Sequence, residues 1–315
     1  MSGVERVLMT GGTGFFGKSL LMEWRRKPYP GRELTVLSRD PARFLARNPE
    51  FGMLAGVRFI TGNIRSFALP LGERFDLVIH AATPVDETLE AVDDRELTDV
   101  ITAGTEHLLK TAADAGVKRL LLTSSGMVYG ALPSGTERIP ETFPVAPVTA
   151  YGRGKAEAER LCLESGIPTV IARCFAFVGP YLPLDAHFAA GNFIRDALAG
   201  RPIVIRGDGR PYRSYLYASD LVKWLWTLLD RGEAGRVYHV GSGRAVSIAE
   251  LARIVAGLVE PPLPVEILSP AGEGLPPRYV PDIFRAEQEL GLRVETDLEE
   301  ALRLTFEFHR KGGIL

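Results

Sequence analysis

The chain reads Thr10-Gly11-Gly12-Thr13-Gly14-Phe15-Phe16-Gly17 directly between an apolar segment at residues 4–9 and a helical pattern at residues 15–26. Each glycine of such a turn has its own use: Gly11 permits a tight bend, Gly14 lets the backbone approach a pyrophosphate, and Gly17 lets the helix pack close to the strand. Free amides at the N-terminus of the helix favour the negative charge of that pyrophosphate. A glycine-rich turn between a strand and a helix therefore predicts a dinucleotide-binding site.

The alternation of strand and helix continues through the first half of the chain. Apolar runs predict strands at residues 34–37, 57–61, 77–80, 119–123 and 169–173, and helical patterns predict helices at residues 41–47, 89–115 and 150–165. Several strands are apolar on both faces, which indicates a sheet covered by helices on both sides. Regular strand–helix–strand order implies parallel pairing with right-handed crossovers. We therefore expect an α/β fold with a doubly wound parallel sheet of the Rossmann type.

The rhythm breaks after Arg173, where turns rich in proline and glycine separate shorter elements. Helices are predicted there at residues 191–199, 219–230, 247–259 and 297–311. A chain of 315 residues suits one large α/β domain with a smaller partner. We expect a dinucleotide-binding domain at residues 1–175 plus about 214–241. A smaller C-terminal α/β substrate-binding domain is expected at about 176–213 plus 242–315.

Composition excludes several classes of partner. The formal net charge is −2, so there is no broad basic field to hold nucleic acid or an anionic membrane. No apolar run approaches the roughly 20 residues that span a bilayer, and the N-terminus lacks the pattern of a signal peptide. Two cysteines, Cys162 and Cys174, cannot form a disulfide framework, and no cluster suggests a metal. We expect a cytoplasmic protein without a metal.

Three strand ends are predicted to border the dinucleotide. After the second strand the chain reads Ser38-Arg39-Asp40. Arg39 can pair with the 2′-phosphate of NADP, whereas Asp40 can reach the 2′-hydroxyl of NAD. We keep both cofactors and favour NADP. Asn63 and Ile64 are placed to border the adenine ring, and the segment Ala81-Ala82-Thr83 is placed to run along the cofactor.

A tyrosine and a lysine form a YxxxK pair at the start of a predicted helix. Tyr151 and Lys155 are four residues apart, which puts both side chains on one helix face. Ser125 lies just beyond the fifth strand, at the sheet edge where open α/β sheets bind ligands. A nearby ammonium and an oxidised nicotinamide favour the phenolate and lower the tyrosine pKa. The pattern predicts Tyr151 as general base, Lys155 as its activator and ribose ligand, and Ser125 as an orienting donor.

The residues predicted to contact the cofactor come from the turn, the strand ends and this helix. They are Gly11, Thr13, Gly14, Phe15, Phe16, Gly17, Ser38, Arg39, Asn63, Ile64, Ala81, Ala82, Thr83, Tyr151 and Lys155.

Seven segments of the chain carry a family resemblance. In chain order they read TGGTGFFG, HAAT, TSSGMVYG, YGRGKAEAE, FVGP, GDGRPYRSYLYASDL and YHVGSGRAVSIAELA. Together they resemble the extended short-chain dehydrogenase/reductase family, and within it the nucleotide-sugar epimerase/dehydratase group. The resemblance implies a catalytic hydroxyl four positions before Tyr129, which is Ser125, with Ser124 as the alternative. It also implies a homodimer built from the helix before Arg119 and the helix that carries Tyr151.

Departures from the family pattern narrow the expected reaction. Dehydratases and decarboxylases of the family usually carry an acidic residue right after the catalytic hydroxyl. Gly126 and Met127 stand there, and neither can transfer a proton. This disfavours 4,6-dehydration and favours epimerisation or reduction of a ketone. Two family asparagines are replaced as well, by Ile101 and Ala176, so the grip on the nucleotide must differ in detail.

The resemblance also implies residues for a nucleotide-diphosphate sugar. Arg213 stands where family members use an arginine against the diphosphate, and a guanidinium can form two parallel bonds to phosphate. Arg278 is a second candidate for the diphosphate, and Asn192 is a candidate for a phosphate. The predicted substrate-binding residues are Ser125, Met127, Asn192, Arg213 and Arg278.

The working hypothesis is an NAD(P)-dependent nucleotide-sugar epimerase. Tyr151 takes a proton from a sugar hydroxyl, at C4 in this interpretation, while a hydride leaves to the nicotinamide. The keto-sugar then turns and receives the hydride on its other face. Three alternatives stay open. They are a 4-keto-sugar reductase, a dehydratase that uses another acid such as Asp86 or Glu87, and a non-enzymatic NAD(P)-sensing protein, which the complete set of Ser125, Tyr151 and Lys155 disfavours. The nucleotide and the sugar are not specified by the sequence.

Overall fold

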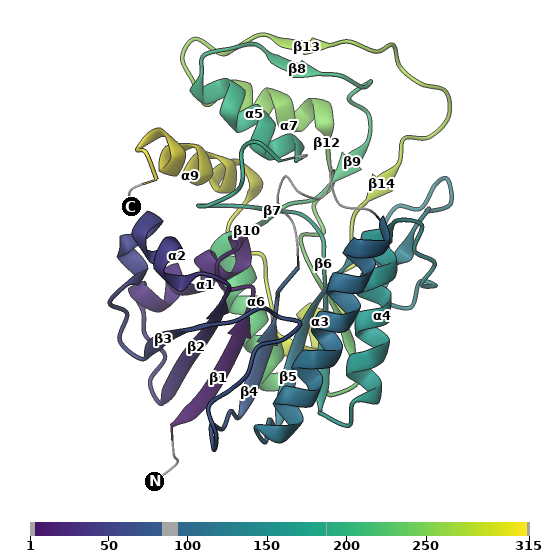
Figure 1. The fold of residues 1–315 in the computed structure, drawn as a ribbon. Coiled ribbons are helices and arrows are strands. Elements are labelled where there is room, and N and C mark those ends of the chain that lie inside the picture. Colours follow the sequence, from purple (N-terminus) through teal and green to yellow (C-terminus); the bar gives the residue numbers. More distant parts are fainter. Residues whose placement is uncertain (1–3, 84–93, 187, 314–315) are drawn as a thin grey trace. The chain divides into compact units, whose positions relative to one another are not determined.

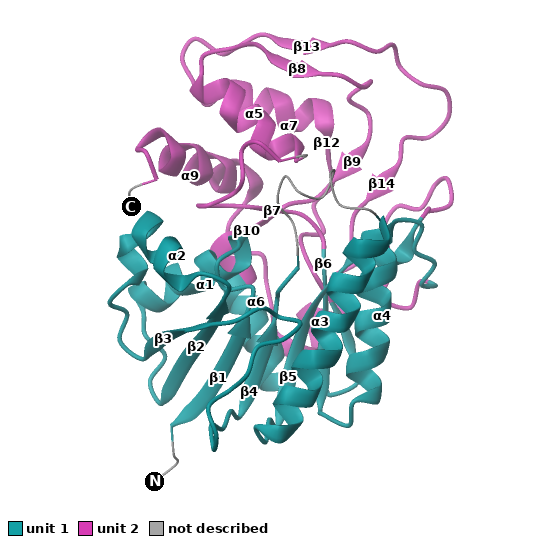
Figure 2. Cartoon of the chain, in the orientation of Figure 1, with its two compact units in different colours: residues 1–130, 144–174, 222–238 teal, residues 131–143, 175–221, 239–315 magenta. Residues whose placement is uncertain are grey.

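The computed structural model describes residues 4–83, 94–186 and 188–313, and the chain divides into two compact units (Figure 2). Unit 1 comprises residues 1–130, 144–174 and 222–238, and unit 2 comprises residues 131–143, 175–221 and 239–315. Residues 131–143 and 214–221, which we expected in the dinucleotide-binding domain, thus belong to unit 2.

Unit 1 is built on a seven-stranded sheet with the strand order β11-β6-β5-β4-β1-β2-β3, in which the pairings from β6 to β3 are parallel. The strands are β1 (Glu5–Thr10), β2 (Arg32–Ser38), β3 (Val57–Thr61), β4 (Leu77–His80), β5 (Arg119–Ser125), β6 (Thr169–Cys174) and β11 (Val237–Val240). All residues of β4 and β6 are buried, as expected for strands covered on both faces.

The helices of this sheet are α1 (Phe15–Arg26), α2 (Pro41–Arg47), α3 (Asp94–Asp114), α4 (Ala150–Glu164) and α6 (Ala218–Arg231). Figure 1 shows α3 and α4 side by side over one face of the sheet, where Ile101 and Ala158 join Leu120 in one apolar core. Helices α1 and α6 meet through the rings of Trp24 and Trp226. The predicted doubly wound sheet is confirmed. Residues 89–93 of the predicted third helix lie outside the described residues.

Unit 2 contains small sheets and helices. Its strands are β7 (Phe177–Val178) with β10 (Leu216–Tyr217), β8 (Ile203–Ile205) with β13 (Val265–Ile267), and the set β12 (Val246–Ser247), β9 (Tyr212–Arg213) and β14 (Arg278–Tyr279). Its helices are α5 (Ala189–Leu198), α7 (Ile248–Ala256), α8 (Phe284–Leu290) and α9 (Leu298–Arg310). A capping box between Ser247 and Glu250 starts α7. The helix ends at Ala256, three residues before the predicted limit at residue 259, and Gly257 is its C-cap.

Candidate active site

The glycine-rich turn after β1 is packed too tightly for side chains. Gly11 has a φ of +75°, and a Cβ atom on it would lie 2.4 Å from the carbonyl carbon of Ala81. A Cβ on Gly17 would lie 2.2 Å from the Cα of Gly12, so the helix packs against its own turn. A Cβ on Gly12 would lie 2.3 Å from a methyl group of Val36 in β2. Sequence reasoning gave Gly12 no role, because its neighbour lies on another strand.

The N-terminus of α1 fits a pyrophosphate. Gly14 is its N-cap residue and supplies no side-chain cap, and the first turn of the helix contains no acidic residue. A Cβ on Gly14 would meet only the Gly11 carbonyl oxygen, at 3.5 Å, so the space in front of the helix is open. Uncapped amides in open space suit an anion, which is the group that a dinucleotide brings there. Thr13, Phe15 and Phe16 are partly exposed around this turn.

The end of β2 presents an arginine. The Asp40 carboxylate accepts a hydrogen bond from the Arg43 amide at 2.9 Å and thereby caps α2. The Ser38 hydroxyl is buried and accepts from the Asp40 amide at 3.3 Å. Arg39 is exposed and has no hydrogen-bond or ion-pair partner within the described part of the chain. The Asp40 carboxylate thus has a hydrogen-bond partner within its own segment, whereas the Arg39 guanidinium is available for a phosphate.

The two residues after β3 have different surroundings. The side-chain oxygen of Asn63 accepts from the Arg65 amide at 3.0 Å, so Asn63 shapes its own exposed turn. Ile64 is half-buried, packs against the core beside α3, and would lie 3.0 Å from a Cβ on Gly104. Only part of the Ile64 side chain is therefore free to border an adenine ring.

Ser125 lies close to Tyr151, and its hydroxyl acts to lower the pKa of the Tyr151 phenol. Ser125 is the last residue of β5 and caps the short 3₁₀ helix η3 (Gly126–Tyr129), because its hydroxyl oxygen accepts from the Met127 amide at 3.1 Å. That leaves the hydroxyl proton of Ser125 for another oxygen. A Cβ on Gly152 would lie 2.6 Å from the Met127 carbonyl oxygen, so glycine beside Tyr151 permits α4 to approach η3.

Lys155 lies one helical turn beyond Tyr151 and is only 3% exposed. Its ammonium donates to the Thr83 hydroxyl at 2.6 Å and to the Thr123 carbonyl oxygen at 2.8 Å. An ammonium has three N–H donors, so these bonds leave one for a ribose hydroxyl. The Nζ atom lies 5.9 Å from the centroid of the Tyr151 ring. The structure thus brings together Ser125, Tyr151, Lys155 and Thr83.

Burial controls the proton affinities in this group. Burial raises the pKa of Tyr151 to about 12, although the nearby Ser125 hydroxyl works in the opposite direction. Burial also lowers the pKa of Lys155 to about 8. This differs from the expected lowering of the tyrosine pKa, because loss of hydration outweighs the nearby polar groups. The Tyr151 phenol is therefore protonated in the protein alone.

A buried polar network lies beside the predicted catalytic residues. The Ser124 hydroxyl bonds to the Glu159 carboxylate, and Arg173 donates to the same carboxylate at 2.7 and 2.9 Å. Arg173 also donates to the Tyr129 hydroxyl at 2.8 Å. Sequence reasoning did not find this network. Its only sequence signal is Glu159, four residues after Lys155 and hence on the same helix face.

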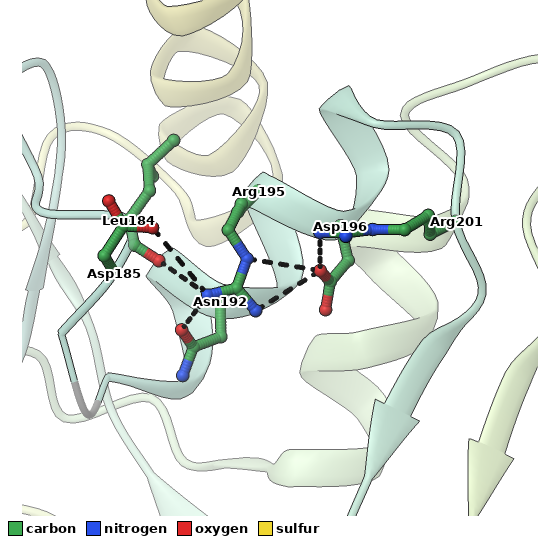
Figure 3. Close-up of polar contacts among 6 residues, drawn as sticks. All are labelled: Leu184, Asp185, Asn192, Arg195, Asp196 and Arg201. Atoms are coloured by element: carbon green, nitrogen blue, oxygen red, sulfur yellow. Dashed lines mark hydrogen bonds and ion pairs between the residues drawn. The ribbon is translucent and has the colours of Figure 1, made fainter.

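The predicted substrate residues Asn192, Arg213 and Arg278 all lie in unit 2. Figure 3 shows Asn192 on α5 beside Arg195, which donates to the Asn192 side-chain oxygen at 3.1 Å. Arg195 also donates to Asp196, at 3.3 Å. The side-chain oxygen of Asn192 thus already accepts a hydrogen bond. Its NH₂ group is the end that can donate to a phosphate.

Arg213 and Arg278 lie on adjacent strands but on opposite faces of their sheet. In the parallel pair of β9 and β14, Arg278 is registered with Tyr212, and Tyr279 with Arg213. Registered residues share a face and consecutive residues alternate. The contacts agree, since Arg278 lies 4.2 Å from the Tyr212 ring centroid and Arg213 lies 5.7 Å from that of Tyr279. The guanidinium groups of Arg213 and Arg278 therefore cannot bind one phosphate group together on the same side of this sheet.

The described ranges contain neither a metal-binding cluster nor a membrane-spanning helix. No group of three or more histidine, cysteine, aspartate or glutamate side chains there is arranged to hold a metal ion. Among the described helices, none is both long and apolar enough to cross a membrane. Asp86 and Glu87, the alternative acids, lie outside the described residues, and Cys162 and Cys174 are buried free thiols.

The doubly wound sheet, the phosphate turn and the Ser–Tyr–Lys set define an extended short-chain dehydrogenase/reductase. Residues 7–241 match the family model described as "NAD dependent epimerase/dehydratase family", and the chain belongs to that family. The membership predicted from the sequence motifs is confirmed. The members similar to this chain are nucleotide-sugar epimerases, dehydratases and decarboxylases.

Three similar proteins represent these three reactions. UDP-glucuronic acid decarboxylase 1 of Xenopus tropicalis is 30% identical over 98% of this chain and 72% of its own length. The solved structure of DesIV, a dTDP-glucose 4,6-dehydratase from Streptomyces venezuelae with NAD and TYD bound, is 26% identical, covers 97% of both chains and has a TM-score of 0.80. The UDP-glucuronic acid 4-epimerase of Bacillus cereus is 21% identical, with 97% of this chain and 99% of that one covered and a TM-score of 0.83, which shows the shared fold.

Proposed function

We propose that this protein is an NAD(P)-dependent nucleotide-sugar epimerase. One observation carries the proposal: Ser125 and Lys155 both lie close to Tyr151, while the two residues that follow Ser125, Gly126 and Met127, cannot transfer a proton. Oxidation of a sugar hydroxyl followed by reduction needs only the first three residues. Elimination of water needs an additional acid, and neither residue after Ser125 supplies one.

Each of the three residues has a defined task. When bound, the oxidised nicotinamide supplies a hydride acceptor and a positive charge. Tyr151 removes the proton of the C4 hydroxyl as the hydride leaves C4, and the Ser125 hydroxyl donates to the same oxygen. Lys155 holds the ribose with its remaining N–H donor. After the keto-sugar turns over, Tyr151 returns the proton and C4 regains a hydride on its other face, so no net oxidation occurs.

The cofactor is proposed to bind at the turn after β1 and along the ends of the neighbouring strands. The open N-terminus of α1 at Gly14 supports the position of the pyrophosphate. DesIV carries NAD, and the exposed Arg39 supports the use of NADP as well. We therefore propose that the protein accepts both dinucleotides and favours NADP.

For the nucleotide-sugar we propose Arg213 as the ligand of the diphosphate and Asn192 as a donor to a phosphate. Arg278 is the alternative diphosphate ligand, on the other face of the β9–β14 pair. Met127, which is 38% exposed, is proposed to border the sugar beside Ser125. The cytoplasmic location and the homodimer stay predictions.

A decarboxylase is the second candidate, because the relative from Xenopus tropicalis is named for that reaction and is similar over almost the whole chain. It begins with the same oxidation at C4, after which a carboxylate at C5 leaves as carbon dioxide. The two functions therefore differ in the substrate and in the mass of the product.

A mass-spectrometric screen tests the proposal. The purified protein is incubated with NAD or NADP and with UDP-, dTDP-, CDP- or GDP-linked hexoses, and with UDP-glucuronic acid. A product of unchanged mass, altered retention and no net change in the cofactor supports the epimerase. Loss of water, loss of carbon dioxide or net oxidation of NADPH would identify a dehydratase, a decarboxylase or a ketone reductase instead.

A further inference from the structure

His80 is the last residue of β4 and is only 4% exposed. Both nitrogens of its ring are hydrogen-bonded. The Nδ1 atom lies 2.8 Å from the Thr10 hydroxyl oxygen at the end of β1, and the Nε2 atom lies 3.0 Å from the Thr105 hydroxyl oxygen on α3. The imidazole thus links two parallel strands to a helix at the edge of the sheet where the phosphate turn begins.

The hydrogen bonds around His80 define one tautomer. The Thr105 hydroxyl donates its single proton to the Ile101 carbonyl oxygen at 2.8 Å, so it can only accept from the ring. The Nε2 atom therefore carries the ring proton. The Nδ1 atom then has a lone pair and accepts the proton of the Thr10 hydroxyl. Burial, with a smaller contribution from Lys155, lowers the pKa of His80 to about 3, so the ring is neutral.

Thr10 extends this chain of bonds to the cofactor side of the sheet. Its hydroxyl oxygen accepts from the Ala82 amide at 3.2 Å, and its carbonyl oxygen accepts from the Ala81 amide at 3.2 Å. Gly11, the next residue, packs directly on the Ala81 carbonyl group. The Thr10 hydroxyl can hold the Ala82 amide and point its proton at His80 only while Nδ1 is an acceptor.

We propose that His80 is a positioning residue for the dinucleotide. Its neutral Nε2–H tautomer orients the Thr10 hydroxyl, and this hydroxyl holds the phosphate turn against the Ala81–Ala82 segment. The proposal rests on the proposed binding of NAD(P) at this turn. A role in core packing alone would instead make His80 and Thr10 matter for stability and not for affinity.

Isothermal calorimetry of NAD binding, together with thermal unfolding, separates the two roles. Thr10→Val removes the bonds to His80 and to the Ala82 amide, and we expect the Kd for NAD to rise about tenfold because buried groups lose their partners. Thr10→Ser keeps the hydroxyl and should stay within about twofold of the unmodified protein. Thr169→Val is the matched control, because it removes another buried strand hydroxyl, one that donates to the Ile167 carbonyl oxygen at 2.9 Å and contacts neither His80 nor Lys155.

We expect the control variant to lose about as much thermal stability as Thr10→Val does. Its Kd for NAD should stay within about twofold of that of the unmodified protein. Equal Kd values in Thr10→Val and Thr169→Val would overturn the proposal. If the unmodified protein binds neither NAD nor NADP, the proposed function fails, and this outcome is distinct from the first.

Nitrogen NMR of the unmodified protein supplies a readout that does not depend on the folding of a variant. The proposal expects the His80 ring to show a protonated Nε2 and an unprotonated Nδ1, and expects the Nδ1 resonance to shift when NAD is added. A protonated Nδ1, or no response of this nitrogen to NAD, would overturn it.

Discussion

Ser124 and Ser125 are neighbours in β5, yet their hydroxyl groups interact with two different residues of α4. Ser124 bonds to the buried Glu159 carboxylate, whereas Ser125 lies close to Tyr151 and acts to lower the pKa of its phenol. The carboxylate is also held by two bonds from Arg173. One serine thus belongs to a buried ion pair, and the other faces the group that reacts.

This difference predicts opposite results for two adjacent substitutions. Ser125→Ala should lower kcat about a hundredfold, because it removes a donor to the reacting oxygen. It should lower the free energy of unfolding by only about 1 kcal/mol, through loss of the cap on η3. Ser124→Ala should retain kcat but lower the free energy of unfolding by about 2 kcal/mol, since the hydroxyl bonds to a charged group. Steady-state kinetics and urea unfolding of both variants check this, and equal kcat values would contradict the role of Ser125.

Tyr151→Phe removes the proposed base and little else. We expect kcat to fall about 10²–10⁴-fold, the range that general acid–base catalysis contributes. The Kd for NAD measured by calorimetry should change by less than about threefold, because the phenol oxygen is proposed to act on the sugar hydroxyl and not on the dinucleotide. Unchanged turnover in a folded variant that still binds NAD would disprove the mechanism.

Two glycines of the phosphate turn should respond differently to alanine. Gly14→Ala has room for the methyl group, so its stability should fall by at most about 1 kcal/mol, the cost of a poorer N-cap. Its Kd for NAD should rise at least about tenfold, because the methyl group occupies the approach to the helix amides. Gly11→Ala meets the Ala81 backbone at a positive φ and should unfold at a much lower temperature. Thermal unfolding and calorimetry check both variants. Tight NAD binding by Gly14→Ala would show that the pyrophosphate does not bind at this turn.

Arg39 should distinguish the two dinucleotides. Its guanidinium has no partner within the described residues, and a 2′-phosphate would supply one. We expect Arg39→Ala to weaken NADP binding about tenfold or more while NAD binding changes by less than about twofold. Arg43→Ala is the matched control, since it removes an exposed positive charge of the same short segment. A similar loss for NADP in both variants would mean that only the general charge matters.

Lys155 predicts a pH dependence of stability with a definite sign. Its pKa falls from the ordinary value of 10.5 to about 8 in the folded protein. Between these two pH values the unfolded chain binds more protons than the folded chain, so this lysine makes the free energy of unfolding rise with pH. Lys155→Met removes that dependence. The stability of the unmodified protein relative to this variant should therefore increase from pH 8 to pH 10 in urea unfolding, and a constant difference would contradict the lowered pKa.

The opposite faces of β9 and β14 give a test for the diphosphate. Arg213→Met should raise the KM for the nucleotide-sugar about tenfold or more, because it removes a charged bond to phosphate. Arg278→Met should leave the KM within about twofold. It loses the contact with the Tyr212 ring, which is worth about 0.5–1 kcal/mol of stability, and a long bond to the Glu137 carbonyl oxygen. The reverse pattern would show that the diphosphate binds on the face that carries Arg278.

The sequence predicted local features well, because their causes lie within a few residues. Strand and helix periods located β4 and β5 to within two residues, and the YxxxK spacing placed Tyr151 and Lys155 on one face of α4. It did not predict the ion pair of Glu159 and Arg173, because those residues meet only when α4 packs on β6. Two oppositely charged residues on separate elements form no local pattern from which a single sequence could predict their pairing.

The sequence by itself determined the doubly wound sheet, the phosphate turn and the identities of the reactive groups, since alternation of apolar residues and glycine spacing act locally. Only the tertiary structure decided which serine faces Tyr151, how His80 is protonated, and on which faces Arg213 and Arg278 stand. These depend on partners that are distant in the chain. Burial among such partners also raised the Tyr151 pKa, because loss of hydration is a property of the folded surroundings and not of the neighbouring residues.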